Sequence, residues 1–222
     1  MEHKRLTLFA GHYGSGKTNI AVNYALRLAK EGKKVCIADL DIVNPYFRTK
    51  DSAAELAAAG IDLISPRFAN TNVDLPALPA ESYRLVQDKS SFGVMDIGGD
   101  DRGAYALGRF ADAIRAEDNY RMAFVLNCFR PLTATVADAM EIMREIEAAA
   151  GLSFTCIVNN SNIGEETTKE VFLESLPFAQ ELCEASNLPL WLHTANSPLA
   201  EEIAGLPVMP LVLQKKYFDL PK

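Results

Sequence analysis

The chain has 222 residues, of which 49% are hydrophobic and 23% charged, and its formal net charge is −7. This length and composition suit one globular domain over residues 1–222 and leave little room for a second. The acidic balance argues against a dedicated nucleic-acid binder, because affinity for a phosphate backbone needs a basic face. We see no apolar run long enough to span a bilayer and no signal-peptide cleavage site near the start, so we expect a cytoplasmic protein with no membrane span.

Apolar strand-like runs alternate along the chain with segments of helical periodicity. This alternation is typical of a parallel sheet covered on both faces by helices. Strands are expected at 6–10, 34–38, 61–64, 92–96, 121–128, 153–158, 189–193 and 207–213, and helices at 17–31, 51–59, 79–88, 103–116, 134–150, 167–175, 177–186 and 198–204. We therefore predict an α/β fold with a mostly parallel central sheet of about seven or eight strands and helices on both faces.

The first strand leads into GHYGSGKT, residues Gly11 to Thr18, which fits the phosphate-loop pattern G-x-x-x-x-G-K-[ST]. Glycines let the backbone curl so that its amides converge on phosphate oxygens, and the following helix turns its positive N-terminus toward the same anion. Lys17 would reach the β- and γ-phosphates, and Thr18 would bind Mg²⁺. The predicted nucleotide contacts are Gly11, His12, Tyr13, Gly14, Ser15, Gly16, Lys17, Thr18 and Asn19. The domain is thus expected to be a three-layer P-loop nucleotide-binding domain.

Two acids, Asp39 and Asp41, follow the second strand at the edge where open α/β sheets bind ligands. Alternation along an extended chain would place both on one side. Asp39 could then hold a water of the magnesium shell while Asp41 orients an attacking water or a substrate hydroxyl. A pair of solvated loop acids is the competing interpretation. The long segment after the third strand, 66–80, is either an ordered flap near the site or a structural crossover.

The fourth strand ends in Asp96, and Gly99 follows in a D-x-x-G pattern. In nucleotide hydrolases an acid at this place holds the Mg²⁺ shell, and the glycine lets a backbone N–H approach the γ-phosphate. The predicted metal ligands are therefore Thr18, Asp39 and Asp96. The predicted catalytic residues are Lys17, Asp41 and Asp39.

Taken together, the phosphate loop, the two acids after strand two, Asp96 with its glycines, and the CIVNN run ending at Asn159 and Asn160 resemble the MinD/ParA/CobQ-type ATPases of the SIMIBI class. The resemblance covers roughly residues 5–210 in order and spacing. It implies an ATP and Mg²⁺ site, with Asp39 and Asp41 serving magnesium and the hydrolytic water. It also implies that Asn159, or Asn160 as the alternative, contacts adenine.

His12 departs from that family, whose MinD and ParA members carry a signature lysine at this position that reaches the partner's nucleotide in a dimer. A neutral imidazole is no reliable substitute for that cation, so nucleotide-driven homodimerisation stays an open expectation. Arg48 or Arg102 could supply the charge as arginine fingers do, although loop arginines are more often simply solvated.

The loop sequence GHYGSGKT is also similar to the phosphate loop of nickel-enzyme maturation GTPases and small-molecule kinases. Guanine recognition normally uses N-K-x-D, whereas the nearest stretch here is NNSN, residues 159–162, which favours adenine. The four cysteines are scattered and expected to be buried thiols, and His193 is expected to be a packed or loop residue. Neither pattern suggests a metal-chaperone cluster.

These patterns lead to one main function and two alternatives. The main hypothesis is a Mg²⁺-dependent ATPase that drives a loop change or a change coupled to a partner. The alternatives are a small-molecule kinase or ATP-dependent ligase of the CobQ type, and a non-hydrolysing nucleotide sensor or assembly factor. The partner, whether protein or small molecule, is not identified by any motif.

Overall fold

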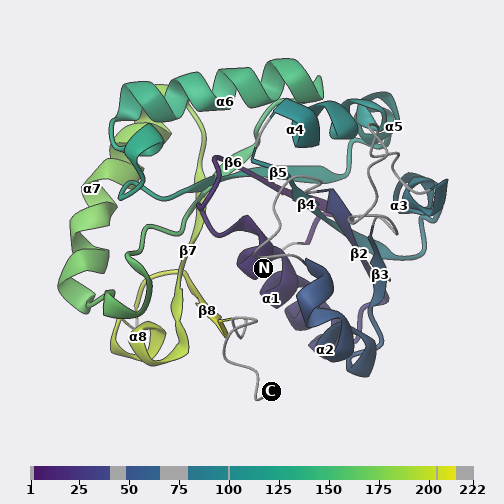
Figure 1. The fold of residues 1–222 in the computed structure, drawn as a ribbon, viewed down its shortest axis with the longest axis horizontal. Helices are drawn as coiled ribbons and strands as arrows, with labels where there is room; N and C mark the ends of the chain where they lie inside the picture. The colour runs from purple at the N-terminus through teal and green to yellow at the C-terminus, as the bar shows by residue number, and fades with distance from the viewer. Residues whose placement is uncertain (1–2, 41–48, 66–79, 100, 204, 214–222) are drawn as a thin grey trace, which may run out of the picture.

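The computed structural model describes residues 3–40, 49–65, 80–99, 101–203 and 205–213. Its centre is an eight-stranded sheet with the order β3-β2-β4-β1-β5-β6-β7-β8, in which each neighbouring pair is parallel (Figure 1). The strands are β1 (Leu6–Ala10), β2 (Val35–Leu40), β3 (Asp62–Ile64), β4 (Phe92–Ile97), β5 (Tyr120–Leu126), β6 (Cys156–Asn159), β7 (Leu190–Asn196) and β8 (Val208–Leu211). The predicted sheet is confirmed.

Helices cover both faces of this sheet. They are α1 (Lys17–Lys30), α2 (Ala53–Ala58), α3 (Arg84–Gln87), α4 (Asp101–Gly108), α5 (Ala111–Glu117), α6 (Val136–Ala150), α7 (Lys169–Ser186) and α8 (Ser197–Glu202), with short 3-10 turns at Thr49–Ser52, Ala80–Tyr83, Pro131–Thr133 and Gly164–Glu166. Figure 1 shows α1 and α2 on one side of the sheet and α4, α5 and α6 on the other.

Two apolar clusters, one on each face, account for this layering. Alternate residues of β2 show it clearly: Ile37 packs with α1, whereas Ala38 packs under the helices of the opposite face. Because successive side chains of a strand point to opposite faces, a strand buried on both sides reads as a continuous apolar run. That is why the strands were visible in the sequence.

Two predictions about where helices begin and end were wrong. The helix expected at 103–116 is two helices, because Phe110 is fully buried between them and its N–H bonds to Leu107 O at 2.9 Å, closing the first helix. The helices expected at 167–175 and 177–186 are the single helix α7, with Pro177 inside it. A proline removes one helical hydrogen bond, and the packing of this helix through residues such as Phe172 and Leu182 outweighs that loss.

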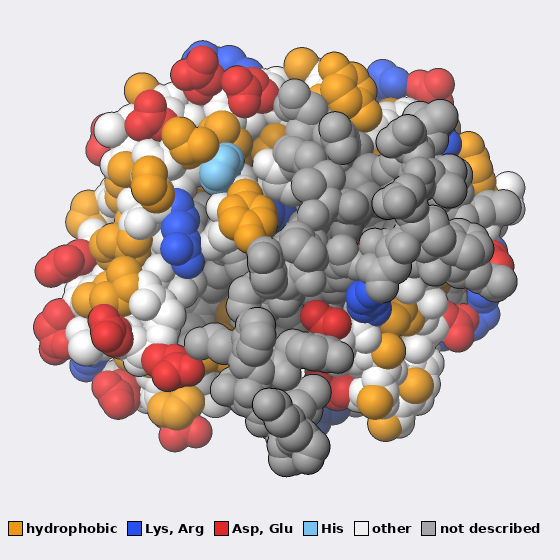
Figure 2. Space-filling view, viewed as in Figure 1, with side chains coloured by type: hydrophobic (Ala, Val, Ile, Leu, Met, Phe, Trp, Pro, Cys, Tyr) orange, Lys and Arg blue, Asp and Glu red, His pale blue; other side chains and the backbone are white. Residues whose placement is uncertain are grey.

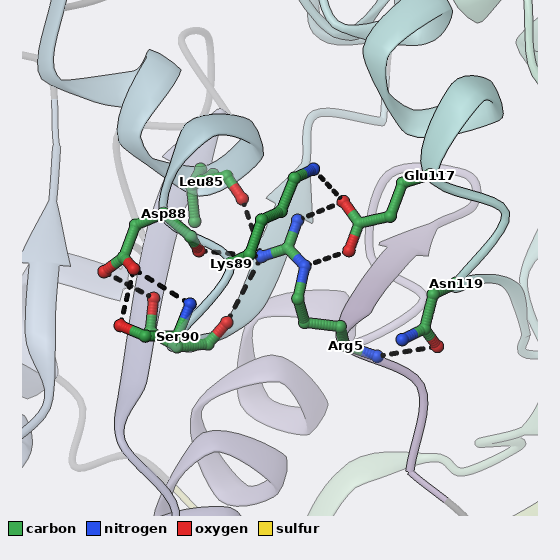
Figure 3. A network of polar contacts seen from close by, with 8 residues as sticks. Arg5, Leu85, Asp88, Lys89, Ser90, Glu117 and Asn119 are labelled. Carbon is green, nitrogen blue, oxygen red and sulfur yellow. Dashed lines mark hydrogen bonds and ion pairs between the residues drawn. The ribbon is translucent and has the colours of Figure 1, made fainter.

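The edge of the sheet where the parallel strands begin is tied together by Arg5 (Figure 3). Its side chain is 8% exposed and forms an ion pair with Glu117, at the end of α5. The same guanidinium donates to the carbonyl oxygens of Leu85, Asp88 and Ser91 at 2.9, 3.2 and 3.2 Å. Arg5 therefore satisfies main-chain acceptors at the end of α3 and before β4. It stabilises the edge opposite the one to which the phosphate loop belongs.

The face of the molecule shown in Figure 2 carries charges of both signs. Figure 2 shows Asp and Glu side chains around the rim, with Lys and Arg side chains scattered between hydrophobic ones. Among the described residues, we find no helix that is both long enough and apolar enough to cross a membrane.

Candidate nucleotide-binding site

The phosphate loop connects β1 to α1 at the edge where the parallel strands end. Its glycines Gly11, Gly14 and Gly16 have φ angles of 153°, 77° and 89°, which residues with a side chain rarely adopt. At Gly16 there is also no room: a Cβ would lie 2.2 Å from Nδ2 of Asn160. This position therefore requires glycine for both conformation and space.

Lys17 and Thr18 open helix α1 and lie against the loop. The Lys17 side chain is only 5% exposed, and its Nζ donates to the carbonyl oxygen of His12 at 3.1 Å. The ammonium group is thus held over the loop, where the positive end of α1 also acts. The hydroxyl of Ser15 is buried and has no hydrogen-bond partner among the described residues. The loop consequently combines fixed positive charge with polar groups, as an anion site requires.

The two acids predicted for the metal, Asp39 and Asp96, lie beside each other in the sheet. They are register partners on the neighbouring strands β2 and β4, and they are 3% and 0% exposed. Register partners in a parallel sheet point to the same face. Here it is the face covered by α1, because Ile37 and Val94, two positions earlier, pack there. Both carboxylates thus lie on the face where α1 begins.

Thr49 fixes one of these carboxylates. It is fully buried, and its hydroxyl donates to Oδ2 of Asp96 at 3.0 Å. The two carboxylates and the hydroxyl of Thr18 are hard oxygen donors of the kind Mg²⁺ prefers, so their chemistry fits that ion. The described residues include no group of three or more His, Cys, Asp or Glu placed to hold a metal.

Gly99 brings the segment after β4 against the phosphate loop. A Cβ on Gly99 would lie 2.6 Å from the main-chain N of Tyr13 and 2.9 Å from Nζ of Lys17. Only a residue without a side chain allows this approach. The structure therefore brings Gly99 to the loop, and its predicted approach to a γ-phosphate stays a prediction.

A cavity of about 720 Å³ opens beside the phosphate loop, over the ends of β5 to β8. Its walls are the phosphate loop itself, amide and hydroxyl side chains, and a set of apolar side chains. The described lining comprises His12, Tyr13, Gly14, Gly16, Lys17, Thr18, Asn19, Arg130, Pro131, Leu132, Asn160, Ser161, Asn162, Gly164, Thr167, Phe172, Thr194, Ala195, Asn196, Leu199, Leu211 and Leu213. None of these residues has a carboxylate.

The two asparagines predicted near adenine occupy different places. Asn160 lines the cavity, and its Nδ2 donates to the carbonyl oxygen of Ser15 at 2.6 Å while its Oδ1 accepts from Oγ1 of Thr194. Asn159 is not among the lining residues. It is 1% exposed, and its Nδ2 contacts Ser175 and Nδ1 of His193 at 2.9 and 3.2 Å.

His193 is a packed residue, as predicted. It is 5% exposed on β7 and stands edge-on to Phe172. Burial lowers the pKa of its imidazole and so favours the neutral ring, whose Nδ1 can accept from Nδ2 of Asn159. The four cysteines are free thiols, and burial raises the pKa of Cys36 and of Cys156 to about 11.

Sequence reasoning missed three residues of this region: Thr49, Asn127 and Arg130. Asn127 follows β5 directly, is fully buried, and exchanges hydrogen bonds with the main chain of Asn162 after β6. Arg130 lies three residues further on, and its Nε donates to the carbonyl oxygen of Gly14 at 3.1 Å. The signal for the last two was their position, since every parallel strand ends at the edge that carries the phosphate loop.

Several sequence predictions lie outside the described residues. These are Asp41 and Arg48, the segment 66–79, and the side chain of Arg102. Their predicted roles stay predictions.

The parallel sheet, the glycine loop before α1 and the acids on β2 and β4 define the fold of a P-loop NTPase. Among solved structures, the chain is similar to FtsY from Mycoplasma mycoides, with 15% identity and a TM-score of 0.56 over 87% of this chain and 60% of that one. It is also similar to FtsY from Thermotoga maritima, with 15% identity and a TM-score of 0.56 over 86% and 61%. The Signal Recognition Particle 54 kDa protein from Aeropyrum pernix, in complex with GDP, matches with 18% identity and a TM-score of 0.56 over 86% and 41%.

At this identity the likeness shows the fold alone, and the chain spans less than two thirds of each of these three structures. It agrees with a P-loop fold and does not single out the MinD/ParA/CobQ type. No protein-family model and no curated protein matched the chain.

Proposed function

We propose that the protein binds ATP with Mg²⁺ and hydrolyses it to drive a conformational change in its loops or in a partner. The observation that carries this proposal is that Lys17, which is 5% exposed against the loop, and the register partners Asp39 and Asp96 lie on the same face of the sheet, where α1 begins. A cation for the phosphates and oxygen donors for their metal then share one edge of the sheet.

Each group has a defined task in this proposal. Amides of the loop and Lys17 neutralise negative charge on the transferring phosphoryl group. Thr18, Asp39 and Asp96 would hold the magnesium ion, which would screen the charge of the phosphate oxygens. Thr49 keeps Asp96 in place through its 3.0 Å hydrogen bond. Asp41 orients the attacking water, as the resemblance implied.

We propose adenine as the base because the described cavity lining offers no carboxylate. A carboxylate is what reads the donor edge of guanine in N-K-x-D sites, so its absence from this lining favours ATP. GTP is the second candidate, because one structural neighbour is in complex with GDP. Competition between the two nucleotides for one labelled analogue decides between them.

A small-molecule kinase or ligase is the second candidate function. The apolar wall formed by Phe172, Leu199 and Leu211 favours it, since this wall could receive an acceptor beside the nucleotide. Phosphate release that depends on an added metabolite would support this candidate, whereas release by the protein alone would support the ATPase.

The phosphate loop is tested by calorimetry with MgATP and MgGTP on the wild type, Lys17→Ala and Lys30→Ala. Lys30 belongs to the last turn of the same helix and is exposed, so it is a matched control. We expect Lys17→Ala to lose nucleotide binding and Lys30→Ala to retain it. Removal of Mg²⁺ with EDTA is expected to weaken nucleotide binding by the wild type. Unchanged affinity in folded Lys17→Ala would overturn the proposal.

A further inference from the structure

The order of the strands sets the direction in which a nucleotide would lie. The phosphate loop follows β1; β4 and β2, which carry Asp96 and Asp39, lie on one side of β1, and β5 to β8 lie on the other. The cavity is lined from the ends of β5, β6, β7 and β8, and neither acid is among its lining residues. A nucleotide with its terminal phosphate near the acids would therefore extend its nucleoside into the cavity.

Arg130 stands on the nucleoside side of the loop, not on the side of the acids. It comes from the segment after β5, lines the cavity, and donates through Nε to the carbonyl oxygen of Gly14. Among the described residues, this is the one hydrogen bond of the Arg130 side chain. No described residue bonds its two terminal NH₂ groups, and Arg130 is exposed, so the guanidinium can reach a ligand in the cavity.

The main chain holds Arg130 in a defined place. Its N–H donates to the carbonyl oxygen of Asn127 at 3.1 Å, and Oγ1 of Thr133 donates to the same oxygen at 2.6 Å. The side chain of Asn127 in turn bonds the main chain of Asn162, which also lines the cavity. The turn that carries Arg130 is therefore linked to the segment after β6, and both flank the cavity.

Side chains from this side also orient the phosphate loop itself. Arg130 binds the carbonyl oxygen of Gly14, and Asn160 binds that of Ser15. The carbonyl and the N–H of a trans peptide point in opposite directions, so holding the Ser15 carbonyl outward turns the N–H of Gly16 inward. Groups of the cavity wall thus act on the loop that receives the phosphates.

We propose that Arg130 is a positioning residue that covers the nucleoside with its guanidinium plane and couples nucleoside binding to the shape of the phosphate loop. This rests on the proposed nucleotide-binding function. A guanidinium stacks on flat rings through cation–π attraction, and the adjacent Pro131 and Leu132 continue an apolar wall suited to a base. Arg130 lies on the nucleoside side of the loop, so it does not replace the signature lysine whose position His12 occupies.

The test compares wild type, Arg130→Lys and Arg130→Ala by calorimetry with three magnesium-loaded ligands: ATP, ADP and inorganic tripolyphosphate. We expect Arg130→Ala to weaken the binding of ATP and ADP by the same factor, about 3- to 30-fold, and to weaken the binding of tripolyphosphate less, because this ligand loses only the effect of the Gly14 contact on the loop. Arg130→Lys keeps the charge but lacks the plane, so it should recover only part of the affinity for ATP and ADP.

Two results would overturn the proposal. Equal weakening of tripolyphosphate binding would show that Arg130 acts only through the phosphates or their loop and not on the nucleoside, and unchanged ATP binding would show a solvated side chain. Arg144→Ala, an exposed arginine on α6, is the control for loss of a positive charge. Failure of the nucleotide-binding function itself is distinct, because the folded wild type would then bind none of the three ligands.

Discussion

Replacement of Gly16 by alanine tests how the phosphate loop is held. Gly16 has φ 89°, and a Cβ there would lie 2.2 Å from Nδ2 of Asn160. The added methyl group must therefore displace the Asn160 side chain and break its 2.6 Å hydrogen bond to the Ser15 carbonyl. Gly32 is a matched control, since it has φ 78° but nothing within 4 Å of a Cβ.

The two glycines separate backbone strain from steric conflict. A left-handed conformation costs an alanine about 1–2 kcal/mol, and the stiffer unfolded chain returns ~0.4–1 kcal/mol. We therefore expect Gly32→Ala to lower the free energy of unfolding by about 1 kcal/mol. Gly16→Ala additionally loses a buried hydrogen bond, which costs about 1–3 kcal/mol, so its total should be about 2–4 kcal/mol.

Urea unfolding of the nucleotide-free protein measures the loss of stability in both variants. The variants Gly16→Ala, Asn160→Ala and Gly16→Ala/Asn160→Ala together form a double-mutant cycle. Both single changes break the same bond between Asn160 and Ser15. The double variant should therefore lose less stability than the sum of the single variants, by about 1–3 kcal/mol. Equal losses for Gly16→Ala and Gly32→Ala, or strict additivity, would refute the reasoning.

Four further predictions concern stability and the metal site. Arg5→Ala should lower the free energy of unfolding by about 3 kcal/mol in urea, because Glu117 would lose its buried partner; a loss below about 1 kcal/mol would contradict this. The hydrogen bond from Arg5 lowers the pKa of Glu117, so its contribution is present above pH 4.5 and lost as pH falls, a dependence that Glu117→Gln should reduce. Burial lowers the pKa of His193, so stability should fall as pH drops below 6.5, by up to about 1.4 kcal/mol per pH unit, and His193→Gln should flatten the curve between pH 7 and 5; an identical curve for that variant would argue against it. Thr49→Val should weaken Mg²⁺-dependent ATP binding by about 10- to 100-fold through loss of the bond to Asp96, and unchanged Mg²⁺ titrations would exclude that role.

The fold was predictable from the sequence because strands buried on both faces are continuous apolar runs separated by helical periodicity. The eight strands were found in order, with errors of a few residues at their ends. The errors among the helices had local causes: the buried Phe110 ended a helix that its periodicity continued, and Pro177 failed to end one.

The site was predictable where its residues belong to one contiguous motif or follow a strand directly. The glycines, Lys17 and Thr18 are fixed by their spacing, and Asp39 and Asp96 by their position at strand ends. That these residues lie close together follows from the rule that parallel strands end at one edge of the sheet. The sequence by itself thus determined a phosphate loop, a candidate metal site and the class of fold.

Only the tertiary structure decided which side chains meet across the loop. Asn159 and Asn160 are adjacent in sequence, yet one packs against His193 and the other binds the phosphate loop, because neighbouring residues at a strand end point to opposite sides. Arg130 lies 116 positions from Gly14 and belongs to no motif, so its hydrogen bond to that carbonyl depends on how β5 is placed beside β1. Contacts of this kind arise from the order of the strands in the sheet, which local sequence patterns do not encode.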